Sequence, residues 1–384
     1  MKISQIYTYP IKALRGVPLS QAQLSEQGLA YDRRFMLLKV HDEYDEQGKP
    51  QRRLENMHIA EFPDLALFLT DIQFPSSAKA TDGKIVLRYK PPGSKPTSES
   101  IEVPLQPQLA SLGQLEVTMH KSPTVAYNMS DKYNAWFSSC LGYEVILAYI
   151  GSNRRQALGT LSPNAATKKS QSGGSSWLSS FTDSIPFMRY PNTVNGEMTK
   201  QDDLTFTDCA QLLVVSETSL ASVSARLPED QEMDIRKFRP NIIVSGASAA
   251  FEEDFWGEIK FLRKSDCNGG MNEGGRRKES TEGSTVGVPD NTVTIHLTHN
   301  CARCKSINID YETGKPGTGE AGKVLKLLMR DRRVDKGTKY SPIFGRYGFL
   351  KEGDAAKYIR VGDEVNVTRH NEERTVFDWP GLTN

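Results

Sequence analysis

The chain has 384 residues, of which 38% are hydrophobic and 25% are charged, a balance typical of a globular protein with a sizeable core. Its length predicts about two or three domains. Lys and Arg total 48 against 47 Asp and Glu, so bulk charge excludes electrostatic attraction to nucleic acid or an anionic membrane. The five cysteines, an odd and low number, argue against a disulfide scaffold and for a reducing compartment. With no long apolar run, signal-peptide core or Arg-rich presequence, the sequence predicts no transmembrane anchor and a cytoplasmic location by default.

In chain order, most of the predicted elements are short strands. Apolar or alternating runs predict strands at residues 34–40, 84–89, 115–120, 212–215, 241–245, 292–298, 306–310 and 359–367. Helices are predicted at 131–141, 217–227 and 322–330, the first two with serine caps at Ser130 and Ser216. Because strands outnumber helices and alternation suits antiparallel pairing, the sequence predicts a β-rich α+β fold with barrel-like sheets.

Two long stretches have the composition of linkers. Residues 151–192 are predicted to separate an N-terminal domain, 1–150, from a second domain, 193–370. Residues 264–290 lie between predicted strands, so we expect a disordered insertion within the second domain.

The most cysteine-dense segment ends at Cys304, and several chemistries compete for it. A zinc site would use His296, His299, Cys301 and Cys304, but the spacing is compressed. A thioredoxin-type pair would need a helix after the cysteines, where a strand is predicted. In a third arrangement one thiolate binds a soft metal centre and Arg303 lies beside an anionic group. A buried structural cysteine pair is the remaining alternative.

A glycine-rich segment at residues 314–324 contains G-x-G-x-x-G and most of a phosphate-loop pattern. Val324 replaces the Ser or Thr whose hydroxyl would hold the metal ion, and Asp310 is too far away for a tight strand–loop–helix unit. We therefore predict a flexible loop that ends where a helix begins.

Basic residues also lie beside several predicted strand ends. Lys12 ends the first strand, Arg34 begins another, and Arg239 precedes a third. Alone, each is a charged strand end in solvent. Together with the cysteine loop they could surround an anionic cofactor, because the planar fork of Arg binds phosphate bidentately.

Taken together, these residues resemble the MOSC-domain proteins that carry an N-terminal β-barrel module. This family includes the mitochondrial amidoxime-reducing components and the C-terminal domain of molybdenum cofactor sulfurase. Each similar motif is weak alone, but their joint order is specific. The similar segments are 9–18, 32–35, 206–208, 216–220, 238–242, 249–256, 301–304, 309–314, 341–345 and 361–363.

The resemblance implies a molybdenum cofactor, molybdenum bound to molybdopterin, held between an N-terminal β-barrel module and a MOSC β-barrel domain. It implies that Cys304 is the metal ligand and the catalytic centre, with Arg303 at the cofactor. The other implied contacts to the pterin or its phosphate are Lys12, Arg34, Asp208, Arg239 and Asn241.

Two positions depart from the amidoxime-reducing pattern. Ala13 replaces a Ser and Cys209 replaces a Thr, and each change removes a hydrogen bond worth about 0.5–1.5 kcal/mol. Cys209 is therefore either a second thiol at the cofactor or a small buried residue.

The resemblance implies an oxidoreductase that reduces N-hydroxylated, amidoxime-like small molecules. Its electrons would come from an external donor such as a cytochrome b5 and its reductase. The alternatives are a carrier or sulfur-transfer module for the cofactor without its own turnover, or a scaffold that binds nothing. The sulfurase relatives carry a pyridoxal-phosphate domain ahead of the similar region, whereas this chain starts at the N-terminal barrel. Because animal relatives are anchored in the outer mitochondrial membrane, mitochondrial association is the alternative location.

Overall fold

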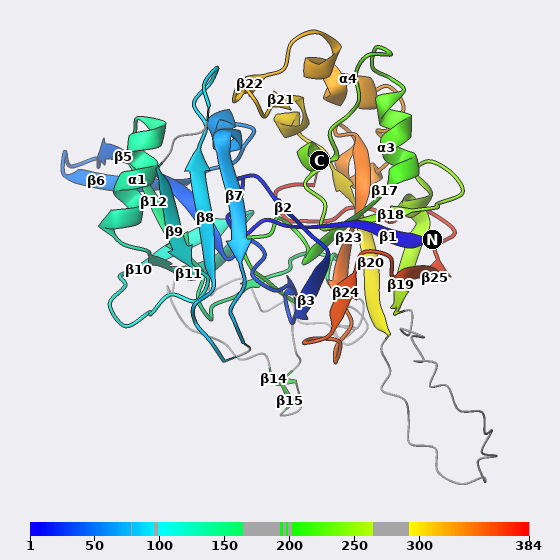
Figure 1. Ribbon diagram of the computed structural model, residues 1–384, viewed down its shortest axis with the longest axis horizontal. Helices are drawn as coiled ribbons and strands as arrows, with labels where there is room; N and C mark the ends of the chain where they lie inside the picture. Colours follow the sequence, from blue (N-terminus) through cyan, green and yellow to red (C-terminus); the bar gives the residue numbers. More distant parts are fainter. Residues whose placement is uncertain are drawn as a thin grey trace, which may run out of the picture.

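The computed structural model describes residues 1–77, 79–95, 99–163, 193–194, 197–198, 202–263 and 292–383. Strands outnumber helices in this part of the chain, so the predicted β-rich α+β fold is confirmed. Two strand-rich halves lie side by side, one mostly blue to cyan and the other mostly green to red in Figure 1. In the described residues no helix is long and apolar enough to cross a membrane.

Seven of the described strands form a closed barrel in one half. Strand β1 closes it by pairing with β18 on one side and β25 on the other. The pair β17–β18 is parallel, and the other neighbouring pairs are antiparallel. Around the barrel the strands are β1 (Lys2–Thr8), β18 (Ile242–Ser245), β17 (Leu212–Ser216), β23 (Ile343–Leu350), β20 (Val293–Ala302), β19 (Trp256–Leu262) and β25 (Glu364–His370).

In the described residues, the other half contains two large antiparallel sheets and one α-helix. Helix α1 (Asp131–Leu141) packs its Trp136 and Phe137 rings against Phe68, with ring centroids 5.8 and 5.3 Å apart. This contact explains the apolar face that predicted the helix. One sheet contains β6 (Pro50–Asn56), β5 (Phe35–Tyr44), β12 (Val145–Tyr149), β11 (Ser122–Asn128) and β10 (Gln114–Met119), and the other contains β7 (Phe68–Gln73), β8 (Lys84–Tyr89) and β9 (Ser100–Pro104).

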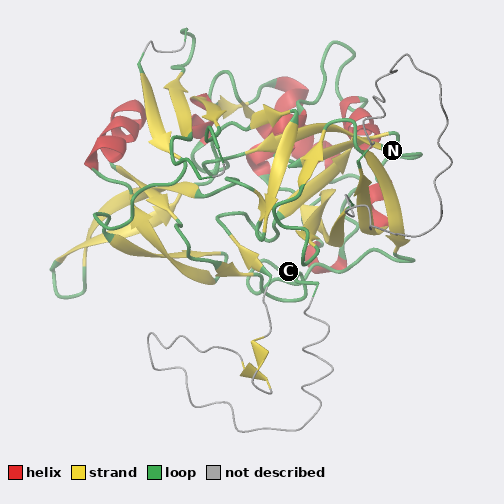
Figure 2. Ribbon diagram, turned by 60° about the horizontal axis from the view of Figure 1, so that its bottom comes forward, coloured by secondary structure: helices red, strands yellow, loops and turns green. Residues whose placement is uncertain are grey.

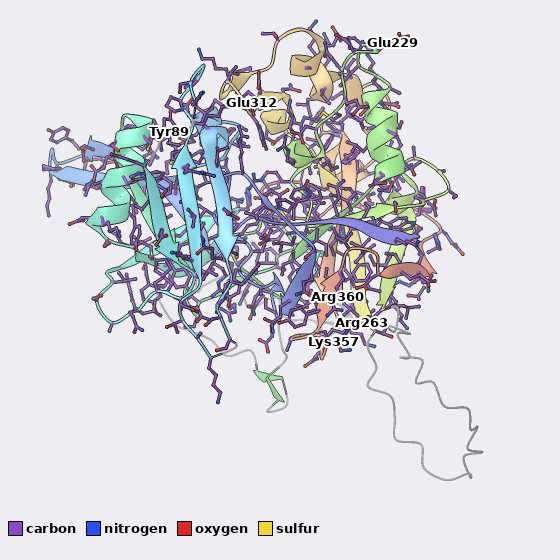
Figure 3. All side chains as sticks on the ribbon, in the orientation of Figure 1. Tyr89, Glu229, Arg263, Glu312, Lys357 and Arg360 are labelled. Carbon is purple, nitrogen blue, oxygen red and sulfur yellow. The ribbon has the colours of Figure 1, made fainter. Side chains whose placement is uncertain are left out.

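Shorter elements link these sheets, and helices lie mainly outside the strand layers in Figure 2. Helix α3 (Glu217–Ser224) begins after Ser216, whose hydroxyl accepts the Ser219 N–H. The other helical elements are α4 (Val324–Leu328), η1 (Pro63–Leu67), η2 (Ile235–Phe238), η3 (Glu252–Phe255), η4 (Lys305–Asn308), η5 (Gly319–Lys323) and η6 (Lys336–Thr338). The short strands are β2 (Val17–Leu19), β3 (Gln21–Ser25), β4 (Gly28–Leu29), β13 (Arg155–Gln156), β14 (Thr193–Val194), β15 (Glu197–Met198), β16 (Asp203–Leu204), β21 (Ile309–Asp310), β22 (Lys315–Pro316) and β24 (Tyr358–Arg360).

Several predicted boundaries were wrong. The strand predicted at 306–310 is mostly the 3-10 turn η4, and only β21 is extended. The strand predicted at 359–367 is interrupted by Gly362 at φ 94°, where the Asp363 carboxylate accepts the Arg360 N–H at 2.8 Å. This local turn breaks the apolar run into β24 and β25. The helices predicted at 217–227 and 322–330 are the shorter α3 and α4.

The domain limits of 1–150 and 193–370 stay a prediction. Strands β1 and β2 lie in the sheet of the C-terminal barrel, although they precede all strands of the other half. Residues 164–192 of the predicted linker and the whole predicted insertion, 264–290, lie outside the described residues.

Candidate functional site

A pocket opens between the two halves, with an empty volume of about 810 Å³. Its walls come from the loops after β1 and β6, the turn before β5, the segments before β17 and β18, and the end of β20. Most of the residues singled out in the sequence meet here. The predicted site residues that line it are Lys12, Asp208, Arg239, Asn241, Arg303 and Cys304.

Lys12 and Asp208 form an ion pair in this pocket. Lys12 is buried, whereas the Asp208 side chain is about half exposed, with a fractional exposure of 53%. Burial lowers the pKa of Lys12, against the opposing effect of Asp208. Desolvation alone would raise the pKa of Asp208. The Lys12 ammonium and a hydrogen bond with His120 outweigh this effect and lower the pKa to well below its usual value. The pocket therefore holds a charged lysine–aspartate pair.

Arg33, next to the predicted Arg34, is buried at the same pocket. Its guanidinium pairs with Asp32 and donates to the Asn241 Oδ1 at 3.2 Å and to the Arg239 carbonyl at 3.1 Å. Asn241 in turn donates to the Tyr7 carbonyl at 3.2 Å. These bonds fix both side chains at the junction of the two halves.

Arg239 and Arg33 both lie over the same aromatic ring. The guanidinium carbons of Arg239 and Arg33 are 4.3 and 4.6 Å from the centroid of the buried Tyr9 ring. The Nη1 of Arg239 donates to the Leu14 carbonyl at 2.6 Å. Arg239 also has a left-handed backbone, φ 57°, an uncommon conformation for a residue with a side chain. The fold thus holds two cations on one aromatic platform.

The two cysteines of the dense segment differ in access. Cys301 is a buried residue of β20, and its sulfur accepts a hydrogen bond from the Arg303 Nη1 at 3.0 Å. Burial raises the pKa of the Cys301 thiol, although Arg303 opposes this effect. Cys304 follows the strand and is exposed, with its sulfur 3.2 Å from the Ser306 hydroxyl. Cys304 is therefore the accessible thiol of the pocket.

The geometry excludes the zinc alternative. His296 faces Glu258 on the barrel at 3.3 Å, and the buried His299 faces the Thr160 hydroxyl at 3.3 Å. Over the described residues there is no group of three or more His, Cys, Asp or Glu that could hold a metal ion. The strand β20 continues to Ala302, so the two cysteines also do not form the strand–helix corner of a thioredoxin pair.

Two predicted site residues lie elsewhere. Arg34 does not line the pocket, because its guanidinium donates to the Gly151 carbonyl and lies 5.9 Å from the Tyr149 ring. Cys209 is buried in a hydrophobic cluster with Phe349 and Trp379. That burial raises the pKa of its thiol well above the usual value. Cys209 is thus placed as a small buried residue.

Three further residues at the site carry little signal in the sequence. His58 lines the pocket, and His120 lies 3.5 Å from Asp208, but each is an isolated histidine in the sequence. Arg155 is fully buried and donates to the carbonyls of Met119 at 3.0 Å and Asp208 at 3.1 Å. It therefore fixes the segments that carry His120 and Asp208, a role that only the fold reveals.

Comparison with known proteins identifies the family. Residues 1–144 match the MOSC N-terminal beta barrel domain, and residues 201–366 match the MOSC domain. The chain belongs to the MOSC-domain proteins with this N-terminal module, as the resemblance indicated.

The relatives are distant but similar over long stretches. The chain is 26% identical over 200 residues to mitochondrial amidoxime-reducing component 1 of Homo sapiens, a match that covers 49% of each chain. It is 23% identical over 375 residues to mitochondrial amidoxime reducing component 2 of Rattus norvegicus, covering 94% of this chain and 82% of the relative. It is 22% identical over 380 residues to molybdenum cofactor sulfurase of Oryza sativa subsp. japonica, covering 94% of this chain and 35% of the relative. The match thus spans about half the length of the human relative and about a third of the sulfurase.

Proposed function

We propose that this protein is a molybdenum-cofactor oxidoreductase that reduces N-hydroxylated, amidoxime-like substrates, with Cys304 as the metal ligand. The observation that carries the proposal is an exposed thiol at the end of β20 in a pocket lined by buried cations. The relatives named for amidoxime reduction support the class of reaction.

The charge of the pocket fits an anionic cofactor. Four cationic side chains line it, and three of them hold their positions through hydrogen bonds to backbone carbonyls. The carboxylates beside them are Asp32 and Asp208. Because buried charge is costly unless it is paired, a phosphate-bearing ligand would stabilise this arrangement. The four cations are Lys12, Arg33, Arg239 and Arg303.

Polar atoms without a hydrogen-bond partner also support a polar ligand in the pocket. The Arg303 Nη2 donates to the Phe238 carbonyl at 2.7 Å, but its Nε has no hydrogen-bond partner in the described structure. The Thr207 Oγ1 also has none there. Buried polar atoms are normally paired, so both atoms are suited to a polar ligand in this pocket.

Each of these residues would contact a particular part of the cofactor. Molybdenum is soft enough to prefer a thiolate, so Cys304 would bind the metal. Arg239 and Lys12 would bind the phosphate, and Asn241 would bind the pterin. Bound there, the cofactor supplies two-electron redox chemistry, while the protein supplies orientation and electrostatics. Electrons would come from an external donor such as a cytochrome b5 and its reductase.

The decisive experiment is metal and pterin analysis of protein from a host that makes the cofactor, followed by reduction of benzamidoxime with a chemical reductant. The wild type should carry molybdenum and release benzamidine. Cys304→Ser should lose activity, because a hydroxyl is a poor ligand for a soft metal. Cys301→Ser is the matched control and should be milder, since Cys301 is buried beneath Arg303. Absence of molybdenum in the wild type, or equal loss in both variants, would contradict the proposal.

The sulfurase match, which covers 94% of this chain, favours a second candidate. In that case the pocket would hold the cofactor for transfer or sulfuration by a partner. Molybdenum-loaded protein that fails to reduce benzamidoxime, yet passes its cofactor to an apoenzyme, would favour this function.

A further inference from the structure

His58 gives the pocket a wall from the half opposite Cys301 and Cys304. It follows β6, and the preceding residue, Met57, donates its N–H to the Leu37 carbonyl at 3.1 Å. The His58 carbonyl accepts the N–H groups of Glu61 and Phe62 at 3.0 and 2.8 Å. The backbone of this loop is therefore fixed, and it holds the imidazole at the pocket.

The ring of His120 packs against the His58 imidazole. The ring centroids of His58 and His120 are 5.7 Å apart with an angle of 27° between the planes, a stacked arrangement. The Nε2 of His120 lies 3.5 Å from the Oδ1 of Asp208, which also pairs with Lys12. Asp208 thus orients the His120 ring, on which His58 stacks.

The backbone that carries His120 is strained. His120 and Lys121 form the two-residue turn between β10 and β11, with φ of 51° and 62°. Such turns are usually built from Asn, Asp and Gly, because both positions need positive φ. The Trp379 Nε1 donates to the His120 carbonyl at 2.6 Å, and Arg155 donates to the Met119 carbonyl at 3.0 Å. Strain held by such buried contacts is typical of functional sites.

The charged groups that face His58 are Lys12, Asp208, His120 and Glu55. Burial and Lys12 lower the pKa of His58 to about 4, so the ring is neutral when the pocket holds no anion. A bound anion would offset the field of Lys12, the second cause of the shift after burial, and so raise the pKa of His58. Its protonation would then be coupled to filling of the pocket.

We propose that His58 donates a proton to the oxygen that leaves an N-hydroxylated substrate, and that His120 and Asp208 are its positioning residues. The inference rests on the proposed function. The N–O bond breaks, an N–H bond forms and the oxygen leaves as water, which consumes two electrons and two protons. The cofactor, held by Cys304 in the proposed function, would supply the two electrons, and an external one-electron donor would replace them one at a time. An imidazolium N–H of His58 supplies one proton and is restored from solvent, and solvent supplies the other.

The first test compares His58→Gln with His41→Gln. Both variants remove one imidazole from the same half, but His41 lies on β5 and pairs with Glu55. At equal molybdenum content, His58→Gln should lower kcat for benzamidoxime about 100-fold, the range of general acid catalysis. The fall of kcat at alkaline pH, which reports loss of the donor proton, should disappear as well. His41→Gln should keep the rate and the profile of the wild type.

The second test needs no turnover. In molybdenum-loaded wild-type protein labelled with ¹³C-histidine, the Cε1 signal missing from His58→Gln should titrate near neutral pH. In His120→Gln this midpoint should move, because the stacking partner is lost. A His58 that stays neutral down to pH 5 in loaded protein, or an unchanged kcat profile in His58→Gln, overturns this inference alone. Protein without molybdenum overturns the proposed function together with it.

Discussion

The ammonium group of Lys12 and the carboxylate of Asp208 form an ion pair between residues 196 positions apart in the chain. Lys12 is also tied to the N-terminal half, since its N–H donates to the Phe35 carbonyl at 2.8 Å. Asp208 lies close to His120 of that half as well. The pair therefore joins the loop after β1 to the segment before β17 at the pocket. As a result, the folding stability of the protein depends on the charges of Lys12 and Asp208.

Asp208→Asn should destabilise the cofactor-free protein by about 1–3 kcal/mol. Lys12 would remain buried without an anionic partner, which costs several kcal/mol in a closed interior and less here because Asp208 is half exposed. The pKa of Asp208 is depressed, so its stabilising effect is present above the usual carboxyl pKa of about 4 and is lost as the pH falls further. Urea denaturation between pH 3 and 7 measures both effects.

Glu43→Gln is the control for this prediction, because it removes a carboxylate whose side chain is 46% exposed and pairs with Arg53, which is 49% exposed. A surface pair of this kind contributes little, about 0–1 kcal/mol. Equal destabilisation by the two substitutions would show that burial of Lys12 does not matter.

Arg239→Ala should lower cofactor occupancy by roughly ten- to a hundred-fold, the loss expected for a charge-assisted contact of about 1.5–3 kcal/mol. Arg236→Ala removes the same charge three residues earlier, where the side chain pairs with Asp234 away from the pocket. Molybdenum and pterin in the two purified variants give the comparison. Matched contents would remove Arg239 from the site.

Local patterns predicted the fold well where local forces decide it. The helix α1 and the strand β8 have the predicted bounds, since periodicity and a turn signal define them. The closure of the barrel by β1 could not be predicted, because pairing with Ile242 and Glu364 is a contact between distant segments. Hydrophobic patterns show which face of a strand is buried, but not its partner.

The site was predicted at the level of motifs rather than of side chains. In the Asp32-Arg33-Arg34 run, two adjacent guanidiniums have the same chemistry, and only the backbone decides which one enters the pocket. Arg33 has a positive φ of 48° and turns inward, whereas Arg34 points to Gly151. His58 and His120 could not be predicted, because ring stacking and a strained turn leave no pattern in the sequence.

Arg33 and Arg34 can be compared directly by substitution. Arg33→Lys should reduce cofactor occupancy, because lysine keeps the charge but cannot reproduce the fork that binds Asp32, Asn241 and the Arg239 carbonyl. Arg34→Lys should leave occupancy close to that of the wild type. Pterin fluorescence after release from each variant provides the measurement. The reverse order of effects would restore Arg34 as the cofactor contact.

A titration away from the pocket should set how the stability of the barrel changes between pH 4.5 and 7. Glu253 is fully buried, and its carboxylate accepts the Ser219 hydroxyl at 2.7 Å and the Ser216 N–H at 3.4 Å. Burial raises its pKa to about 7, although these hydrogen bonds oppose the shift. The folded protein therefore keeps a proton that the unfolded chain has already released at this pH.

Glu253→Gln should accordingly change how stability depends on pH. A raised folded-state pKa makes the wild type lose stability as the pH rises from about 4.5 to 7, with no further loss above. The glutamine variant lacks this loss, so between pH 4.5 and 8 it should gain about 3 kcal/mol on the wild type. Free energies of unfolding from urea titrations at the two pH values measure the change. Glu252→Gln is the control, since hydrogen bonds from Ser248 and Ala249 outweigh desolvation and lower the pKa of Glu252. Its effect on stability therefore falls mainly below pH 4.5, and the substitution should leave the pH dependence between 4.5 and 8 nearly unchanged. If both substitutions shift the pH dependence in the same direction, burial of Glu253 is not its cause.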